Sequence, residues 1–239
     1  MKKKLGIIGG MGSQAGVWLL QRVTELTEAA NDQDYLEILL HSNSQIPDRT
    51  SAILYNGFSP VGELTRSVKL LNDCGVDTIV MACMTAYYFY DEIVKTSRAE
   101  IIHPLNVVRD NLTSNLNFAN KKVIGLIGSS GLVKSRIFHD FLEPLGYEVV
   151  ALNDQEQQKY FTNPIYRSAK LGLCDESVQD TFMYQFDILK SLGAEIIVGA
   201  CSEVPLMIKN FKVPGDFINL FEVLAQHVVD QCYYREYAT

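Results

Sequence analysis

The sequence predicts an α/β fold built from two similar halves, each a parallel sheet flanked by helices. Two observations lead to this prediction. Short runs of β-branched residues and leucine alternate with longer amphipathic stretches along the 239 residues. The pattern also repeats: Gly9 and Gly128 end similar runs 119 positions apart, and Cys83 and Cys201 end another similar pair 118 positions apart. We therefore expect two small doubly wound domains that face each other across a cleft.

The predicted strands are short, apolar and bounded by Gly, Asp, Asn or Pro, as buried strands are. In chain order they cover residues 5–8, 36–40, 78–82, 101–102, 123–127, 148–152, 196–198 and 217–218. The predicted helices space their apolar residues at three and four positions. They cover residues 16–30, 62–74, 132–145, 176–192 and 222–233. Because strands and helices alternate, both sheets should be parallel and covered on both faces.

The repeat also suggests where the chain divides. Residues 4–9 resemble 123–128, and residues 75–83 resemble 193–201. We expect residues 1–100 plus 213–239 to form the first domain and residues 101–212 to form the second.

Composition narrows the possible partners and compartment. A net charge of −7 with scattered Lys and Arg argues against binding to nucleic acid, which needs clustered cations. No apolar run approaches the roughly 20 residues of a membrane helix, and the run after the lysines at 2–4 is too short for a targeting signal. Five cysteines without a C-x-x-C spacing fit reduced thiols in the cytoplasm.

Two of the five cysteines are candidates for chemistry. Cys83 and Cys201 each end a predicted strand and precede a predicted turn toward a helix, where backbone N–H groups lower the pKa of a thiol. Two such thiols facing one cleft could remove a proton from one face of a carbon and return one to the other face. A single cysteine at a strand end is usually a small packing residue, and we assign that role to Cys74, Cys174 and Cys232.

Nucleotide and metal sites are less well supported. Residues 10–15 fit the G-x-G-x-x-G/A pattern of dinucleotide sites, but the second predicted strand runs into residues 40–43, which offer no acid for a ribose. The P-loop pattern is absent, and none of the four histidines has a second ligand at a short spacing. We therefore expect no cofactor and no metal. Arg49, on a loop after the second strand, could clamp a carboxylate.

Five segments in order resemble the aspartate/glutamate racemase family, whose members work without pyridoxal phosphate. The segments are Gly-Gly-Met-Gly at 9–12, Ile-Pro-Asp-Arg-Thr at 46–50, Cys-Met-Thr-Ala-Tyr at 83–87, Ile-Tyr followed by Lys-Leu-Gly within 165–172, and Gly-Ala-Cys-Ser-Glu-Val-Pro-Leu at 199–206. The resemblance covers nearly the whole chain. It implies two Rossmann-like domains, a homodimer, and a two-base mechanism with Cys83 and Cys201 on a small anionic amino acid.

The resemblance also assigns substrate binding. Arg49 and Lys170 stand where the family binds substrate carboxylates. Backbone N–H groups and hydroxyls around the thiols are candidate donors to the charge that develops on the substrate. The full predicted substrate-binding set is Met11, Arg49, Met84, Thr85, Ser129, Ser130, Lys170, Ser202 and Glu203.

Two departures from the family pattern leave the substrate open. Met84 replaces an asparagine beside the first cysteine, which removes two hydrogen-bond donors and an acceptor. Tyr87 replaces a histidine and offers one hydroxyl in return. We therefore expect an aspartate racemase, with glutamate as the second substrate. The alternatives are an isomerase or lyase acting on another small carboxylic acid, and an amino-acid-binding homologue with weakened turnover.

Overall fold

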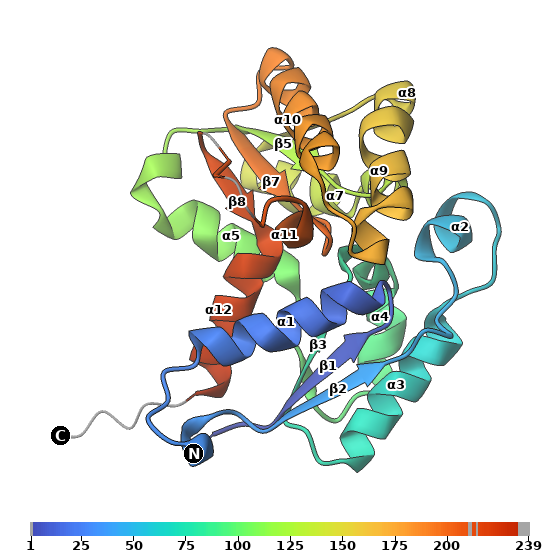
Figure 1. Cartoon of the computed structure of the whole chain (residues 1–239), viewed down its shortest axis with the longest axis vertical. Coiled ribbons are helices and arrows are strands. Elements are labelled where there is room, and N and C mark those ends of the chain that lie inside the picture. Colours follow the sequence, from blue (N-terminus) through green and yellow to red (C-terminus); the bar gives the residue numbers. More distant parts are fainter. Residues whose placement is uncertain (1, 210–211, 214, 234–239) are drawn as a thin grey trace.

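The computed structural model describes residues 2–209, 212–213 and 215–233, which form two lobes (Figure 1). Each lobe contains a four-stranded sheet in which every pairing is parallel. The first sheet has the order β2-β1-β3-β4 and the second the order β6-β5-β7-β8. These matching orders confirm the predicted α/β fold with two pseudo-symmetric halves. The strands are β1 (Leu5–Gly9), β2 (Ile38–Ser42), β3 (Thr78–Met81), β4 (Glu100–Ile101), β5 (Val123–Ile127), β6 (Glu148–Ala151), β7 (Ile196–Gly199) and β8 (Phe217–Asn219).

Helices flank both sheets (Figure 1). None of the described helices is long and apolar enough to cross a membrane. The predicted helix 132–145 was wrong as a single element, because Arg136 adopts a left-handed backbone conformation with φ 58° and separates two short helices. The helices are α1 (Ser13–Leu26), α2 (Arg49–Leu54), α3 (Val61–Asp73), α4 (Tyr90–Ile93), α5 (Pro104–Ser114), α6 (Ser130–Lys134), α7 (Ile137–Leu142), α8 (Asp154–Glu156), α9 (Asn163–Arg167), α10 (Glu176–Ser191), α11 (Val204–Met207) and α12 (Leu220–Cys232).

The central strands of both sheets are almost fully buried. All residues of β1, β3 and β7 are buried, as are all but the first of β5. Burial on both faces explains why these strands are continuous apolar runs rather than alternating patterns. Their burial supplies the hydrophobic stabilisation that fixes the carboxyl ends of β3 and β7 in place.

The C-terminal segment contributes to both halves, which differs from the predicted division. Residues 213–239 were assigned to the first domain, but β8 pairs with β7 in the second sheet. Helix α12 then packs against α1 and α5, and Arg22 Nε on α1 donates to Glu222 on α12 at 2.7 Å. The predicted start of the second domain at 101 also cuts β4 of the first sheet. Residues 214 and 234–239 lie outside the described part of the chain.

Gly10 shapes the turn that follows β1. Its φ is +91°, and a Cβ atom there would lie 2.3 Å from the backbone of Asn43. We expect Gly10→Ala to lower the free energy of unfolding by at least about 2 kcal/mol, because strain and a backbone clash add. Gly62→Ala in α3 is the matched control, since a Cβ there meets nothing within 4 Å. Urea denaturation of both variants checks this, and equal midpoints would contradict it.

Candidate active site

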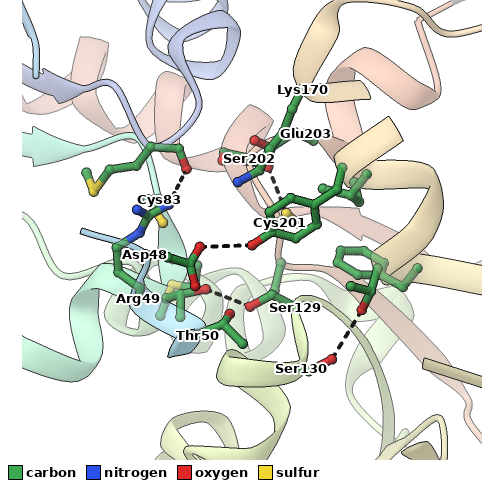
Figure 2. Close-up of a pocket in the computed structure, with 18 residues that line it drawn as sticks. Asp48, Arg49, Thr50, Cys83, Ser129, Ser130, Lys170, Cys201, Ser202 and Glu203 are labelled. Carbon is green, nitrogen blue, oxygen red and sulfur yellow. Dashed lines mark hydrogen bonds between the residues drawn. The ribbon is translucent and has the colours of Figure 1, made fainter. Parts of the chain in front are cut away.

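The carboxyl ends of β3 and β7 open onto one pocket between the two halves. Cys83 lies two residues after β3 and Cys201 two residues after β7, and both line this pocket. Figure 2 shows side chains from the strand-end turns of both sheets converging there. In open parallel sheets this is the edge at which ligands bind. The structure therefore brings two thiols from equivalent positions to one cavity.

Direct contacts hold the two halves together around the pocket. Thr85 Oγ1 and Ser129 Oγ lie 2.8 Å apart, and the Tyr166 hydroxyl donates to Asp48 Oδ2 at 2.9 Å (Figure 2). Helices α2 and α6 also touch, since a Cβ at Gly131 would lie 2.7 Å from Thr50 Oγ1. These contacts fix the two sets of site residues relative to each other.

Arg49 is buried and held by backbone oxygens. One of its terminal nitrogens donates to the Met11 carbonyl at 2.9 Å, and the other donates to the Pro47 carbonyl at 3.0 Å. Burial opposes its charge, yet the neighbouring Cys83 and Asp48 outweigh that effect and raise the pKa of Arg49. The guanidinium is therefore a fixed positive charge beside Cys83.

Cys201 lies beside a carboxylate rather than a cation. Its Sγ donates to Glu203 Oε2 at 2.9 Å, and Ser202 Oγ donates to the same oxygen at 3.1 Å. Burial, followed by the charge of Glu203, raises the pKa of Cys201 well above its ordinary value. The sequence-based expectation of a lowered pKa was wrong for this thiol. Helix α11 begins three residues later and has only four residues, so it supplies little of the expected dipole.

Lys170 is the second cation at the pocket. It lies in the 3-10 turn Ala169–Leu171, with Nζ 4.3 Å from the centre of the Tyr166 ring. Within the described part of the chain no carboxylate lies within ion-pair distance of it. Its charge is therefore available to an anionic ligand.

All of the sequence-predicted site residues line this one pocket: Met11, Arg49, Cys83, Met84, Thr85, Ser129, Ser130, Lys170, Cys201, Ser202 and Glu203. The prediction missed Phe161, Thr162 and Ile165, which also line it. The first two lie in a π-helical segment, Gln157–Thr162, that continues into α9. Such segments often mark functional sites, but the sequence carries no signal for them.

Tyr87 does not line the pocket, which corrects the expectation that its hydroxyl compensates for the asparagine replaced by Met84. The Tyr87 hydroxyl instead accepts a hydrogen bond from the Met81 backbone N–H at 3.0 Å. Its ring packs edge-on against His103, with 5.2 Å between the ring centres. Burial raises the pKa of Tyr87. The Met84 side chain therefore faces the pocket without that added donor.

No group of three or more His, Cys, Asp or Glu side chains among the described residues is arranged to hold a metal ion.

Comparison with known proteins identifies the family. The family model for Asp/Glu/hydantoin racemases matches residues 8–228. The broad specificity amino-acid racemase RacX of Bacillus subtilis (strain 168) is 23% identical over 229 residues, which cover 94% of this chain and 96% of RacX. The aspartate racemase of Picrophilus torridus superposes with a TM-score of 0.80 and 26% identity, covering 97% of this chain and 95% of that one.

More distant structures share the fold alone. A glutamate racemase from Francisella tularensis, solved with D-glutamate, superposes with a TM-score of 0.67 at 13% identity, covering 96% of this chain and 80% of that one. The family model spans most of the sequence, and both halves of the fold have counterparts in the solved structures. The chain therefore belongs to the Asp/Glu/hydantoin racemase family of isomerases.

Proposed function

We propose that this protein interconverts the D and L forms of an amino acid by a two-base mechanism in which Cys83 and Cys201 are the bases. One observation carries the proposal: two thiols from equivalent strand ends of the two halves line one pocket. A single base returns a proton to the face it came from, whereas two bases on opposite sides of a carbon can invert it. No cofactor is needed for the proton transfers themselves.

The reaction balances within the pair of thiols. The thiolate of one cysteine takes the α-proton and becomes a thiol, while the other thiol gives its proton to the opposite face and becomes a thiolate. The α-proton is very weakly acidic, so the charge that develops on the substrate carboxylate needs stabilisation. Lys170 and the hydroxyls of Thr85, Ser129 and Ser202 line the pocket and are the candidate partners for that charge.

Aspartate is the substrate that we propose first, with glutamate second. The Picrophilus torridus relative is named an aspartate racemase, and Lys170 offers a cation without a carboxylate partner in the described residues. RacX is named a broad specificity enzyme, and the apolar side chains of Met84, Phe161 and Ile165 line the same pocket. Amino acids with uncharged side chains therefore belong in the same assay.

Substitution of Met84 tests which side chains of the pocket determine substrate selectivity. We expect Met84→Asn to raise aspartate turnover by about 2- to 10-fold, because the amide restores hydrogen-bond donors beside the reacting carbon. Chiral chromatography after incubation with each enantiomer of aspartate, glutamate and alanine gives the rates. Met183→Asn, on α10 and away from the pocket, is the control.

The same assay separates the alternatives. Formation of a product other than the opposite enantiomer would indicate an isomerase or lyase acting on another bond. Thermal stabilisation by aspartate without any turnover would indicate a binding protein. Either result would contradict the proposed racemase activity. An unchanged rate of aspartate turnover in Met84→Asn would contradict the proposed role of Met84 in substrate choice.

A further inference from the structure

We propose that a groove between α4, α5 and α7 binds a small organic ammonium ion with an aromatic or aliphatic body. The groove is separate from the active-site pocket, since the two share none of the described residues that line them. Its cavity volume is about 490 Å³, which lies in the range of small-molecule sites. The proposal concerns a second ligand and does not depend on the proposed racemisation.

Segments that follow strands of both sheets form the groove. Residues within 87–91 follow β3, residues within 103–106 follow β4, and residues within 135–141 follow β5. Helices α5 and α7 are in contact, which joins the two walls. The groove therefore lies beyond the carboxyl ends of the strands, where ligands bind in parallel sheets.

Apolar and aromatic side chains line the groove: Tyr87, Tyr88, Tyr90, His103, Ile137 and Phe141. The His103 ring packs edge-on against Tyr87 and Tyr90, with 5.2 and 4.7 Å between the ring centres. The Tyr87 hydroxyl accepts a hydrogen bond from the Met81 backbone N–H at 3.0 Å. The Tyr90 hydroxyl donates to the Ile101 carbonyl at 3.4 Å. Because both hydroxyls bond to the backbone, these tyrosines offer the groove fixed ring surface.

The charge in the groove is negative. Asp91 and Asp140 line it, and no lysine or arginine is among the described residues that do so. Arg136 lies 3.5 Å from Asp140, whereas none of the ion pairs within the described part of the chain involves Asp91. Burial, followed by the charge of Asp91, raises the pKa of Tyr90. Burial lowers the pKa of His103, so this ring is neutral at pH 7 and adds no positive charge.

An organic ammonium ion matches this combination of rings and carboxylates. Aromatic faces attract a cation that lies within about 6 Å of the ring centre, and Tyr88 is 50% exposed. The carboxylate of Asp91 supplies the opposite charge. Arg109 donates to Asn106 in the groove wall but is paired with Asp110. The active-site pocket, in contrast, is lined by two cations. The two sites therefore favour ligands of opposite charge.

Isothermal titration calorimetry of the full chain with 2-phenylethylamine tests the proposal at pH 7, where the amine is charged. The neutral analogue 2-phenylethanol has the same ring and chain. We expect the amine to bind at least about 10-fold more tightly than the alcohol, because only the amine can pair with a carboxylate and with the faces of the rings. Burial of the phenyl ring alone predicts equal affinities.

Two variants locate the bound amine. We expect Asp91→Asn to weaken amine binding by at least about 5-fold and to leave binding of 2-phenylethanol unchanged. Glu92→Gln is the matched control, because Glu92 is the next residue and is also exposed but does not line the groove. Its effect should stay below about 2-fold.

Three results would overturn the proposal. They are no binding of the amine to the wild type, equal affinities for the amine and the alcohol, and equal weakening by Asp91→Asn and Glu92→Gln. Both substituted side chains are exposed, and thermal melts of the two variants check that each is folded. Amine binding with the expected order in a protein that racemises nothing would support this inference and refute the proposed function.

Discussion

Replacing either Cys83 or Cys201 with alanine is expected to abolish racemisation, with a loss of at least about 10²- to 10⁴-fold in kcat. In the proposed two-base reaction each variant lacks either the base or the acid that inversion requires, and positioned proton transfer contributes a factor of this size. Both side chains face the pocket, so the substitutions leave the buried strands β3 and β7 untouched. Initial rates by chiral chromatography measure the loss.

Exchange of the α-proton distinguishes the single-cysteine variants from a protein whose active site has lost its structure. A remaining thiolate can still remove the α-proton of one enantiomer and return a solvent proton to the same face. We therefore expect Cys201→Ala to exchange the α-proton of one enantiomer only, with retention of configuration. Cys74→Ala, at an exposed position outside the pocket, is the control and should racemise normally. Racemisation at near wild-type rate in either active-site variant would contradict the two-base assignment.

Lys170→Gln is expected to lower kcat/KM by about 10- to 100-fold. The substitution removes the pocket cation that has no carboxylate partner among the described residues, and a hydrogen bond to a charged group is worth about 1.5–3 kcal/mol. The loss should fall mainly on KM, because in the proposed reaction the ammonium would contact the substrate in the ground state as well as in the transition state.

Lys159→Gln provides the matched control for Lys170. Lys159 also lies over a tyrosine ring, with Nζ 4.7 Å from the centre of the Tyr160 ring, but neither residue lines the pocket. Its substitution should leave kcat/KM unchanged. Equal effects of the two substitutions would mean that Lys170 acts through the overall charge of the protein rather than through contact with the substrate.

Much of the fold could be predicted from the sequence, because its strongest signals are local. The buried central strands are continuous apolar runs, and the internal repeat shows that they occur in two sets. Helix α5 was missed because it begins at Pro104 after a histidine cap, in which His103 Nδ1 accepts the Leu105 N–H, rather than after Ser, Thr, Asp or Asn. Residues 217–232 contribute to both halves. This arrangement depends on pairing between distant strands, which no local pattern encodes.

The active site, like the fold, could be predicted from the sequence only in part. Motifs predicted which residues line the pocket, because strand ends and turns are visible in the sequence. They did not predict that Arg49 would bind backbone oxygens, that Tyr87 would turn toward β3, or that Glu203 would accept a hydrogen bond from Cys201. Each of these contacts depends on three-dimensional packing and burial, and each changes the chemistry of its residue.

The most direct test is the fate of the α-hydrogen in D₂O. Wild-type protein is incubated with L-aspartate and separately with D-aspartate, and both enantiomers are recovered at low conversion and examined by proton NMR. The two-base account predicts that the newly formed enantiomer carries deuterium at Cα while the recovered starting enantiomer keeps its proton. Deuterium in neither enantiomer, or equal deuterium in both, would contradict the assignment of Cys83 and Cys201 as bases on opposite faces of the substrate.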